Sequence, residues 1–393
     1  MLLDFTFKNV RSFKDTVTFS METGEYITKL QKKNTCRQKD IRLLKSTYIL
    51  GGNATGKSNV LRAFDILRQV VLVGTPSELT ELFTDTYASN TENTEFQIRF
   101  FKNNKLFTYM LIYNSDYITE ESLAVNQQIV FKRSQSDLQV PSLLEHLKGA
   151  LRQNQPLLYF AQDNNVPEAK EAYEWFRQDI ISPRLYGYAV LDQQIFRPLL
   201  VDSELKDNLL YFLQAADFNI LDIKVTEIIL EEHEEIKRKQ LQVDFIHKSD
   251  DGHTFTLNWS AESSGTKIFI MLAMHFIQRV NKNTLFIIDE FDRSLHPKLV
   301  RILIRLFNEW NTHNQFIVTT HNHEILNDNL RVDQIWFVDK NYQGVSELYS
   351  AFDFDETSLT MHQLKKNYQN GLYGGDQIID EDGLLAILRE QHG

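Results

Sequence analysis

The sequence predicts an α/β fold built around a mostly parallel sheet, and two observations predict it. A glycine-rich segment at 51–58 lies between an apolar run at 47–50 and an amphipathic stretch that continues to residue 73. After Trp259 the pattern alternates between helix and strand, as in the βαβ units of parallel sheets. With 393 residues the chain exceeds the usual size of one hydrophobic core, so we expect a second lobe or an inserted subdomain.

The composition is that of an ordinary globular protein, with 42% apolar and 24% charged residues. No run approaches the roughly 18 uncharged apolar residues of a membrane span. The first residues alternate like a strand and include Asp4, so we expect no signal peptide. The one cysteine, Cys36, excludes an intramolecular disulfide, and the cytoplasm is the simplest compartment.

The net charge of −11 disfavours a protein whose surface is built to coat DNA. Residues 29–45 nevertheless hold seven Lys and Arg against one Asp. Such a run is compatible with a solvated loop, and also with a patch that contacts phosphates.

The elements outside the glycine loop follow from periodicity. Residues 5–13 and 15–21 alternate, which predicts antiparallel strands, and three more strand-like runs are expected between 94 and 130. From 136 to 221 the pattern predicts an inserted helical subdomain, after which strands return as a meander with an Asp-Gly turn. We therefore expect an N-terminal lobe (1–135), a helical insertion (136–221), a C-terminal lobe (222–350) and a tail (351–393).

The glycine-rich segment reads GGNATGKS and fits the phosphate-loop pattern G-x-x-x-x-G-K-[ST], in the strand–loop–helix context that the pattern requires. Backbone N–H groups of the loop and of the helix N-terminus can surround a polyphosphate. Lys57 is expected to reach the β- and γ-phosphates of a nucleotide, and the Ser58 hydroxyl to hold Mg²⁺. The expected binding residues here are Gly51, Asn53, Ala54, Thr55, Gly56, Lys57, Ser58 and Asn59.

Two later strands are expected to bring catalytic groups beside this loop. The apolar run 285–290 ends in Asp289 and Glu290 and suits a buried parallel strand. We expect Asp289 to bind Mg²⁺ and Glu290 to polarise an attacking water. A further strand ends at His321, whose side chain is expected to hydrogen-bond the γ-phosphate or that water. The expected catalytic residues are Lys57, Glu290 and His321.

A second anion-binding device is expected at Ser263, Ser264 and Gly265, before a helix that is apolar on nearly all sides. The same residues would also serve as an ordinary N-cap. Since one protomer offers this turn no obvious ligand, its natural use is across a dimer. Another helix is expected to begin at Pro297 and to bury Leu299, Ile302, Leu303, Leu306 and Trp310.

Together these motifs resemble the ABC-type ATPase heads of the chromosome-maintenance and RecF-like group, over roughly 1–130 and 222–350. The resemblance implies an ABC ATPase head with an antiparallel β lobe, and a diverged signature in which Glu262 replaces the usual Leu. It also implies that residues 9–13 form a nucleotide-contacting strand, with Arg11 and Ser12 at its polar positions. A Q-loop glutamine is not assigned. The candidates are Gln97, Gln127 and Gln128.

Residues 262–266, 289–297, 319–322 and 333–340, with the tail at 368–375, are similar to stand-alone bacterial AAA-family ATPases of the RloA type. Those proteins are commonly encoded beside an RloB-like or Toprim-type nuclease and are linked to phage defence. The resemblance implies an ATPase that uses ATP and Mg²⁺ and controls an effector. From the turn at 263–265 we further expect two protomers to enclose two ATP molecules head to tail, as a homodimer or a higher oligomer built of dimers.

Three other functions remain open from the sequence. A RecF-like repair ATPase would bind DNA directly through 29–45, so nucleic acid remains a candidate partner. An ATP-binding subunit of a transporter fits the diverged signature poorly, and we expect no membrane partner. A small-molecule kinase would not need a signature turn. For nucleic-acid cleavage, the acids at 376–382 are the one C-terminal candidate, and a solvated tail is the simpler interpretation.

Overall fold

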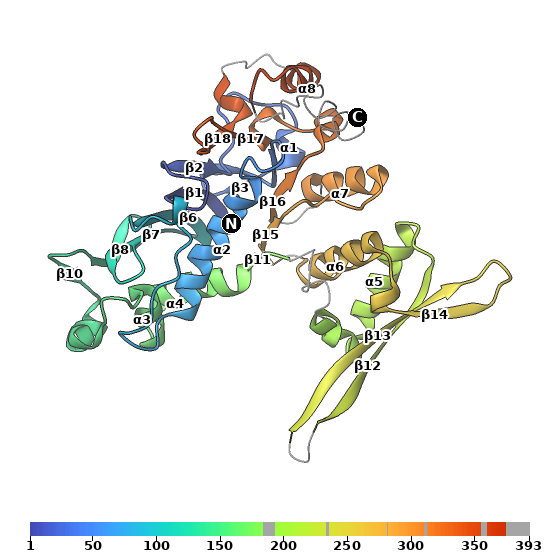
Figure 1. The fold of residues 1–393 in the computed structure, drawn as a ribbon, viewed down its shortest axis with the longest axis horizontal. Helices are drawn as coiled ribbons and strands as arrows, with labels where there is room; N and C mark the ends of the chain where they lie inside the picture. The colour runs from blue at the N-terminus through green and yellow to red at the C-terminus, as the bar shows by residue number, and fades with distance from the viewer. Residues whose placement is uncertain (184–192, 233–235, 281, 310–312, 355–359, 375–393) are drawn as a thin grey trace, which may run out of the picture.

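The computed structural model describes residues 1–183, 193–232, 236–280, 282–309, 313–354 and 360–374. A six-stranded sheet forms its centre, in the order β11-β15-β16-β5-β17-β18 (Figure 1). The first five strands run parallel and the last is antiparallel to its neighbour. Their bounds are β11 Ile180–Ile181, β15 Leu285–Ile288, β16 Gln315–Thr320, β5 Ser46–Leu50, β17 Ile335–Lys340 and β18 Ser346–Ser350.

Helices cover both faces of this sheet. Successive side chains of a strand point to opposite faces. Ile49 and Ile317 accordingly pack in the core with α2 (Lys57–Val73), whereas Leu50 and Val318 pack in a second core with α6 (Ser264–Gln278) and α7 (Pro297–Glu309). Burial on both faces explains why these strands read as continuous apolar runs.

The predicted burial of α7 was wrong in part. The helix buries Val300, Leu303, Ile304 and Phe307, whereas Ile302 is 45% exposed. Leu299 and Leu306 are half-buried, and Trp310 lies outside the described residues. The buried positions are therefore shifted by about one residue along α7 relative to the predicted positions.

A seven-stranded antiparallel sheet forms the N-terminal lobe, in the order β10-β9-β8-β7-β6-β1-β2. The last of the three runs predicted between 94 and 130 is two strands rather than one, because Asn126 and Gln127 adopt positive φ and turn the chain. The bounds are β1 Leu2–Lys8, β2 Val17–Ser20, β6 Thr94–Lys102, β7 Lys105–Tyr113, β8 Ile118–Val125, β9 Gln128–Arg133 and β10 Leu138–Gln139.

The segment between the two lobes is mainly helical, but β11 within it joins the parallel sheet beside β15. Its α-helices are α3 (Leu157–Asp163), α4 (Pro167–Glu174) and α5 (Ser203–Ala215). The 3₁₀ and π-helical segments among the described residues are η1 Tyr87–Ser89, η2 Ser142–Ala150, η3 Trp175–Asp179, η5 Gln193–Leu200, η6 Trp259–Ala261, η7 His323–Asn327, η8 Val332–Gln334 and η9 Ala351–Phe354.

The predicted meander is confirmed as a three-stranded antiparallel sheet of β12 (Ile220–Glu232), β13 (Ile236–Lys248) and β14 (Thr254–Asn258). Its long hairpin extends away from the rest of the molecule (Figure 1). Its base packs in one core with α5 and α6. The remaining elements are α1 Gln31–Asn34, β3 Thr35–Gln38, β4 Ile41–Leu44 and α8 Met361–Gln369.

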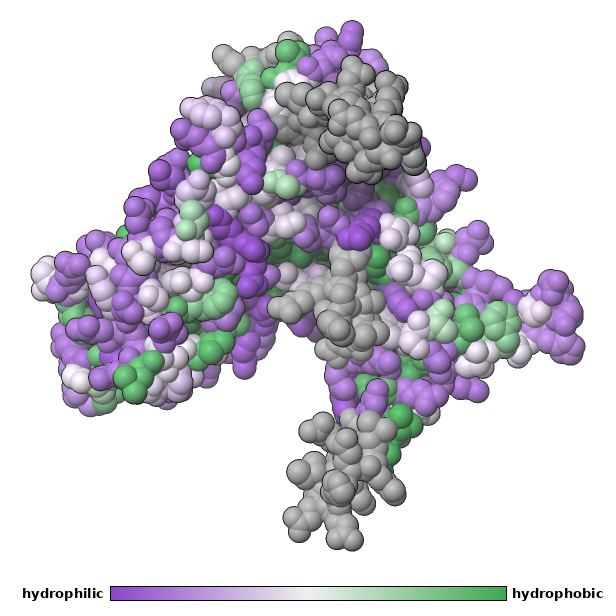
Figure 2. All heavy atoms as spheres, in the orientation of Figure 1, coloured by the Kyte–Doolittle hydropathy of each residue, from purple (hydrophilic) through white to green (hydrophobic). Residues whose placement is uncertain are grey.

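Hydrophilic residues cover most of the face shown in Figure 2, and apolar residues appear on it in small groups. Over the described part of the chain, no helix has both the length and the apolar character that crossing a bilayer requires.

Candidate nucleotide site

The order of the central strands brings the predicted motifs to one edge of the sheet. β16 lies between β5 and β15, with Thr320 level with Leu50 and Val318 level with Ile288. The three strands run parallel, so their carboxyl ends lie side by side. In open α/β sheets, ligands bind outside these ends. The segment that follows each strand therefore faces the same space.

The loop at 51–56 has the backbone shape that its glycines allow. A Cβ atom on Gly51 would lie 2.5 Å from the carbonyl oxygen of Val338. Gly56 has a φ of 120° and is the N-cap of α2. No described side chain caps this helix terminus, so its first N–H groups are open to an anion. Asn53 and Ala54 lie exposed in the loop.

Lys57 lies inside the loop and is only 4% exposed. Its Nζ donates hydrogen bonds to the carbonyl oxygens of Gly51 at 2.8 Å and Gly52 at 2.6 Å. Burial lowers the pKa of Lys57 to about 8, although the carboxylates of Asp289 and Glu290 oppose this change. The residue is thus a desolvated cation whose present acceptors are loop carbonyl groups.

Two oxygen ligands suitable for Mg²⁺ lie next to each other. The Ser58 hydroxyl donates to Oδ1 of Asp289 at 3.1 Å, and the same oxygen accepts from Thr319 at 2.5 Å. Magnesium prefers oxygen ligands and is commonly held by one or two carboxylates together with substrate phosphates. The described residues contain no group of three or more His, Cys, Asp or Glu side chains that could hold a metal alone. The pair therefore fits a magnesium ion whose other ligands come from a nucleotide and water.

The three expected catalytic side chains form one connected series. Nδ1 of His321 lies 3.1 Å from Nζ of Lys57, and its Nε2 lies 3.4 Å from Oε1 of Glu290. Arg293 donates to the other carboxylate oxygen of Glu290 at 3.0 Å. Glu290 has a φ of 45°, an uncommon backbone conformation for this residue type, and its N–H donates to Thr319.

Sequence reasoning missed the two threonines at the end of β16. Thr319 holds Asp289, and the Thr320 hydroxyl donates to Asp292 at 2.8 Å. Burial raises the pKa of Asp292, while the bond from Thr320 opposes that shift. The sequence signal for these contacts is a pair of hydroxyl side chains at the end of one strand, next to a strand that ends in acidic residues.

Ser346, on β18, is a third missed residue. Its hydroxyl donates to the carbonyl oxygen of Thr55 at 2.5 Å and to the hydroxyl of Ser12 at 2.7 Å. Asn59 donates to the same Ser12 oxygen at 2.7 Å. Ser12 thus supports the loop from one side, through contacts between segments that lie hundreds of residues apart. No short sequence pattern predicts these contacts.

The expectation that residues 9–13 form a strand was wrong. They form a turn after β1, closed by bridge pairing between Val10 and Phe13, and Arg11 has a φ of 51°. The N–H of Arg11 donates to the carbonyl of Asp85 at 2.8 Å, and its guanidinium lies 3.3 Å from the Asp85 carboxylate. The described polar contacts of Arg11 are thus with Asp85 rather than with the loop.

The turn at 263–265 forms the N-terminus of α6. Ser263 is the N-cap, and its hydroxyl accepts from the N–H of Thr266 at 3.1 Å. A Cβ atom on Gly265 would lie 2.5 Å from the carbonyl oxygen of Ser294, so the turn packs directly on the segment after the two acids. Ser263 therefore serves as the N-cap of α6, and Gly265 allows the close packing.

The three Q-loop candidates lie outside the parallel sheet. Gln97 lies on β6, Gln127 lies in the turn between β8 and β9, and Gln128 begins β9. All belong to the seven-stranded antiparallel sheet. The sequence alone could not make this distinction, because each follows the phosphate loop within a strand-like run.

The basic run at 29–45 is folded and partly neutralised. Lys33 pairs with Glu309 at 3.0 Å, Arg37 lies 3.7 Å from Asp40, and Lys45 is buried and donates to the carbonyl of Asn308. These contacts neutralise or bury part of the positive charge that a phosphate-binding patch would need to expose.

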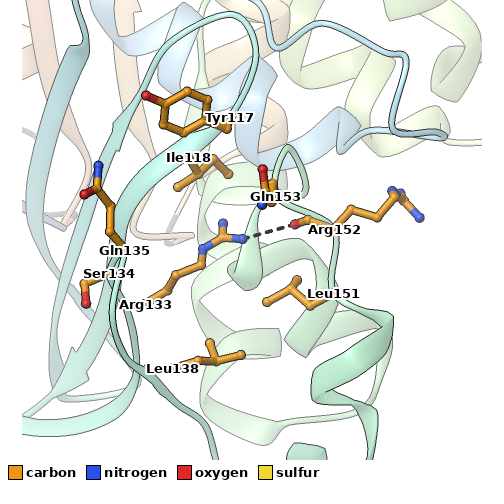
Figure 3. Close-up of a pocket in the computed structure, with 9 residues that line it drawn as sticks. All are labelled: Tyr117, Ile118, Arg133, Ser134, Gln135, Leu138, Leu151, Arg152 and Gln153. Carbon is orange, nitrogen blue, oxygen red and sulfur yellow. Dashed lines mark hydrogen bonds between the residues drawn. The ribbon is translucent and has the colours of Figure 1, made fainter.

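A cavity of about 390 Å³ lies in the N-terminal lobe, between β8–β10 and the chain at 151–153 (Figure 3). Arg133 lines it and pairs with the buried carboxylate of Glu121 at 2.8 Å. Glu121 also accepts the N–H groups of Leu157 and Leu158, at the start of α3. Arg133 is thereby tied to the packing of this lobe, and none of the expected site residues lines the cavity.

The sequence matches, over residues 46–327, a family model described as "AAA domain, putative AbiEii toxin, Type IV TA system". No match was found among curated proteins.

Among solved structures, the chain is similar in fold to an SMC head domain from Thermotoga maritima, at 16% identity and a TM-score of 0.43, covering 89% of this chain and 98% of that one. It is also similar to an SMC head bound to the C-winged helix domain of ScpA, at 14% identity and a TM-score of 0.48, covering 93% of this chain and 99% of that one. A third is an SMC head with an extended coiled coil, bound to the C-terminal domain of ScpA derived from Pyrococcus furiosus, at 14% identity and 0.46, covering 94% and 98%.

Proposed function

The chain belongs to the family described as AAA domain, putative AbiEii toxin, Type IV TA system, and we propose that it binds and hydrolyses ATP with Mg²⁺ in a homodimer that controls an effector. One observation carries the proposal of hydrolysis. At the edge where the parallel strands end, Lys57, His321 and Glu290 are connected, and Ser58 lies beside Asp289. Phosphoryl transfer requires positioning and charge stabilisation, and these residues supply both.

The roles follow from the contacts. Lys57 exchanges its loop carbonyl acceptors for the β- and γ-phosphate oxygens, and the open N–H groups of α2 bind the same phosphates. Ser58 and Asp289 would hold Mg²⁺, which would neutralise the charge that develops on the phosphates. Glu290 orients and polarises the attacking water. His321 bridges Lys57 and Glu290 and thus lies where it can contact the γ-phosphate or that water.

The dimer is proposed because Ser263, Ser264 and Gly265 form a second helix N-terminus suited to an anion. α6 runs for 15 residues and is largely buried, so its dipole favours negative charge at its start. In a head-to-tail pair this turn caps the γ-phosphate held by the other copy. ATP then stabilises the closed dimer and hydrolysis opens it, so the conformation of the dimer depends on the bound nucleotide.

The biological role rests on family description and motif resemblance. The family description refers to a toxin–antitoxin system, and this supports a part in anti-phage defence. We place the destructive reaction in a partner effector, an RloB-like or Toprim-type nuclease, whose activity the nucleotide state would control. Direct DNA binding, as in the RecF-like alternative, receives less support because several charges at 29–45 have partners within the chain.

The Glu290→Gln variant tests this function. The amide leaves the phosphate-binding groups in place but cannot act as the carboxylate, so ATP should bind without turnover and hold the dimer closed. Light scattering after gel filtration, with saturating ATP and Mg²⁺, should show a dimer that dissociates without nucleotide. A monomer under these conditions would overturn the dimer. Glu204→Gln, on an exposed first turn of α5, is the matched control and should behave as wild type.

The effector requires a separate test. The protein encoded next to this chain should copurify with it, and its nuclease activity should differ between the wild type and Glu290→Gln in ATP. A partner nuclease that is equally active with both proteins would remove the regulatory role and leave the ATPase intact.

A further inference from the structure

A hydrogen bond between a buried carboxylate and a half-buried histidine ties the turn at 263–265 to the three-stranded sheet. Nε2 of His247, on β13, lies 2.6 Å from Oε1 of Glu262, the residue immediately before the N-cap Ser263. The side chain of Glu262 is 4% exposed and that of His247 is 13% exposed. We propose that His247 and Glu262 are a positioning pair that sets where the anion-binding turn lies, an inference that rests on the function proposed above for this turn.

The pair matters because a carboxylate at this depth is costly unless a partner satisfies it. A leucine at this position would require only apolar packing. Glu262 adds direction, because a short hydrogen bond to a carboxylate constrains both the distance and the angle between its two groups. Glu262 and Ser263 are consecutive, so any shift of Glu262 moves Ser263 and the first N–H groups of α6.

The sheet holds His247 firmly. In the ladder it stands level with Ile220 on β12 and Phe255 on β14. Its ring stacks on that of Phe255, with centroids 5.4 Å apart and an angle of 19° between the planes. By the alternation along β13, it shares a face with the buried Phe245. The ring therefore moves with the three-stranded sheet, whose hairpin extends away from the molecule (Figure 1).

On its other side the turn abuts the segment that follows the acids, where the α-carbon of Gly265 faces the carbonyl of Ser294 with no room for a side chain. The same segment carries Asp292 and Arg293, which contact Thr320 and Glu290. The turn thus lies between the His247–Glu262 pair and the proposed catalytic acid. A displacement of the sheet would pass through the pair to the γ-phosphate cap, so a partner bound to the hairpin could influence hydrolysis.

Three variants of the full chain test the proposal. Glu262→Gln keeps an oxygen that accepts from His247, whereas Glu262→Leu removes it. His247→Phe keeps a ring that can stack on Phe255 but cannot donate. We expect Glu262→Leu and His247→Phe to weaken ATP-driven self-association about tenfold or more, as the loss of a hydrogen bond to a charged group predicts. ATP binding at protein concentrations too low for self-association should stay unchanged, and Glu262→Gln should restore association to within about twofold of wild type.

The double variant His247→Phe, Glu262→Leu tests whether the two side chains act together as a pair or contribute to packing independently. If the two side chains act as a unit, the double variant associates no more weakly than the worse single variant. Effects that add, or single variants that fold and associate as wild type, would overturn the pair. The Ser263→Arg variant distinguishes failure of the positioning pair from failure of the proposed dimer. If Ser263→Arg also associates normally, the composite site itself is wrong. If only Ser263→Arg is defective, the positioning role alone is lost.

Discussion

The Ser58 hydroxyl lies 3.1 Å from Oδ1 of Asp289, although 231 positions separate the two residues. The contact follows from the strand order, in which β16 is inserted between β5 and β15 and all three strands end at one edge. Two oxygens that suit Mg²⁺ therefore meet only in the folded chain. Their separation in sequence explains why neither motif alone specifies a metal site.

Ser58→Ala should make ATP binding far less dependent on Mg²⁺, because one of the two protein oxygens proposed to hold the ion is gone. ATP titrations with Mg²⁺ and with excess EDTA measure this. Chelation should weaken binding to the wild type and change the variant little. Ser58→Thr keeps the hydroxyl and should retain the wild-type response. An unchanged response to EDTA in Ser58→Ala would remove Ser58 from the metal site.

Lys57→Ala should weaken ATP binding about 10- to 100-fold, the range expected when a hydrogen-bonded charge is removed. Calorimetric titration with a non-hydrolysable ATP analogue gives the affinity directly. Lys298→Ala, on an exposed position at the start of α7, is the control and should bind the analogue normally.

The affinity for ATP should fall as pH rises above about 8, because burial lowers the pKa of Lys57 to about 8 and phosphates bind the charged form. The loss should approach tenfold per pH unit, with uptake of a proton on binding. Lys57→Arg stays charged and should lose this pH dependence. Calorimetry in buffers of different ionisation enthalpy measures the proton. Binding without proton uptake at pH 9 would contradict the assignment.

The same pKa has a consequence for the stability of the free protein. The ordinary lysine pKa is 10.5, so between about pH 8 and 10.5 the unfolded chain binds the proton that folded Lys57 has lost. The contribution of Lys57 to stability therefore rises with pH across this window and is smallest below pH 8. Urea denaturation of the wild type and Lys57→Met across the window isolates it. A constant difference between the two would contradict the lowered pKa.

His321→Ala should lower kcat about 10²- to 10³-fold, the loss typical of a missing transition-state contact, while ATP binding changes much less. Steady-state hydrolysis and analogue binding separate these effects. His323→Ala is the matched control, since His323 lies half-buried at a neighbouring position and contacts Gln369 instead. Equal losses in both variants would point to damage to the local fold.

Gly265→Ala should destabilise the protein by about 1–3 kcal/mol, because the added methyl group meets a backbone carbonyl 2.5 Å away and forces a shift. Gly149→Ala has open space around the new atom and should stay within about 0.5 kcal/mol. Urea denaturation compares the two. A stability of Gly265→Ala equal to that of Gly149→Ala would show that the turn does not pack on Ser294 in this way.

The placement of the loop, the acids and His321 after neighbouring strands could be predicted, because each lies within a short motif whose flanking pattern identifies a strand or helix. The partners of these residues could not. Thr319 and Ser346 contribute through neighbouring strands, and that neighbourhood depends on a strand order that periodicity does not encode. Likewise β11 is two residues long, and a run so short carries no period.

The errors have local physical reasons. At 9–13 the alternation continues past the end of β1, but Asn9 and Arg11 take the left-handed conformation and turn the chain. In α7 an apolar Ile302 faces solvent, because Val300 and Ile304 supply the side chains that meet the sheet. Apolar residues occur on surfaces often enough that a pattern alone cannot choose between two adjacent stripes.

Mixing two inactive variants tests the composite site most directly. In a head-to-tail pair of Lys57→Ala with Ser263→Arg, one site carries both substitutions and the other carries neither. Each variant alone should be inactive while folded, and an equimolar mixture should recover ATPase activity. The recovery is roughly a quarter of the wild-type activity where the two variants pair at random, because half of the dimers are then mixed and each mixed dimer has one intact site of two. A mixture no more active than its components would contradict a site shared between two copies.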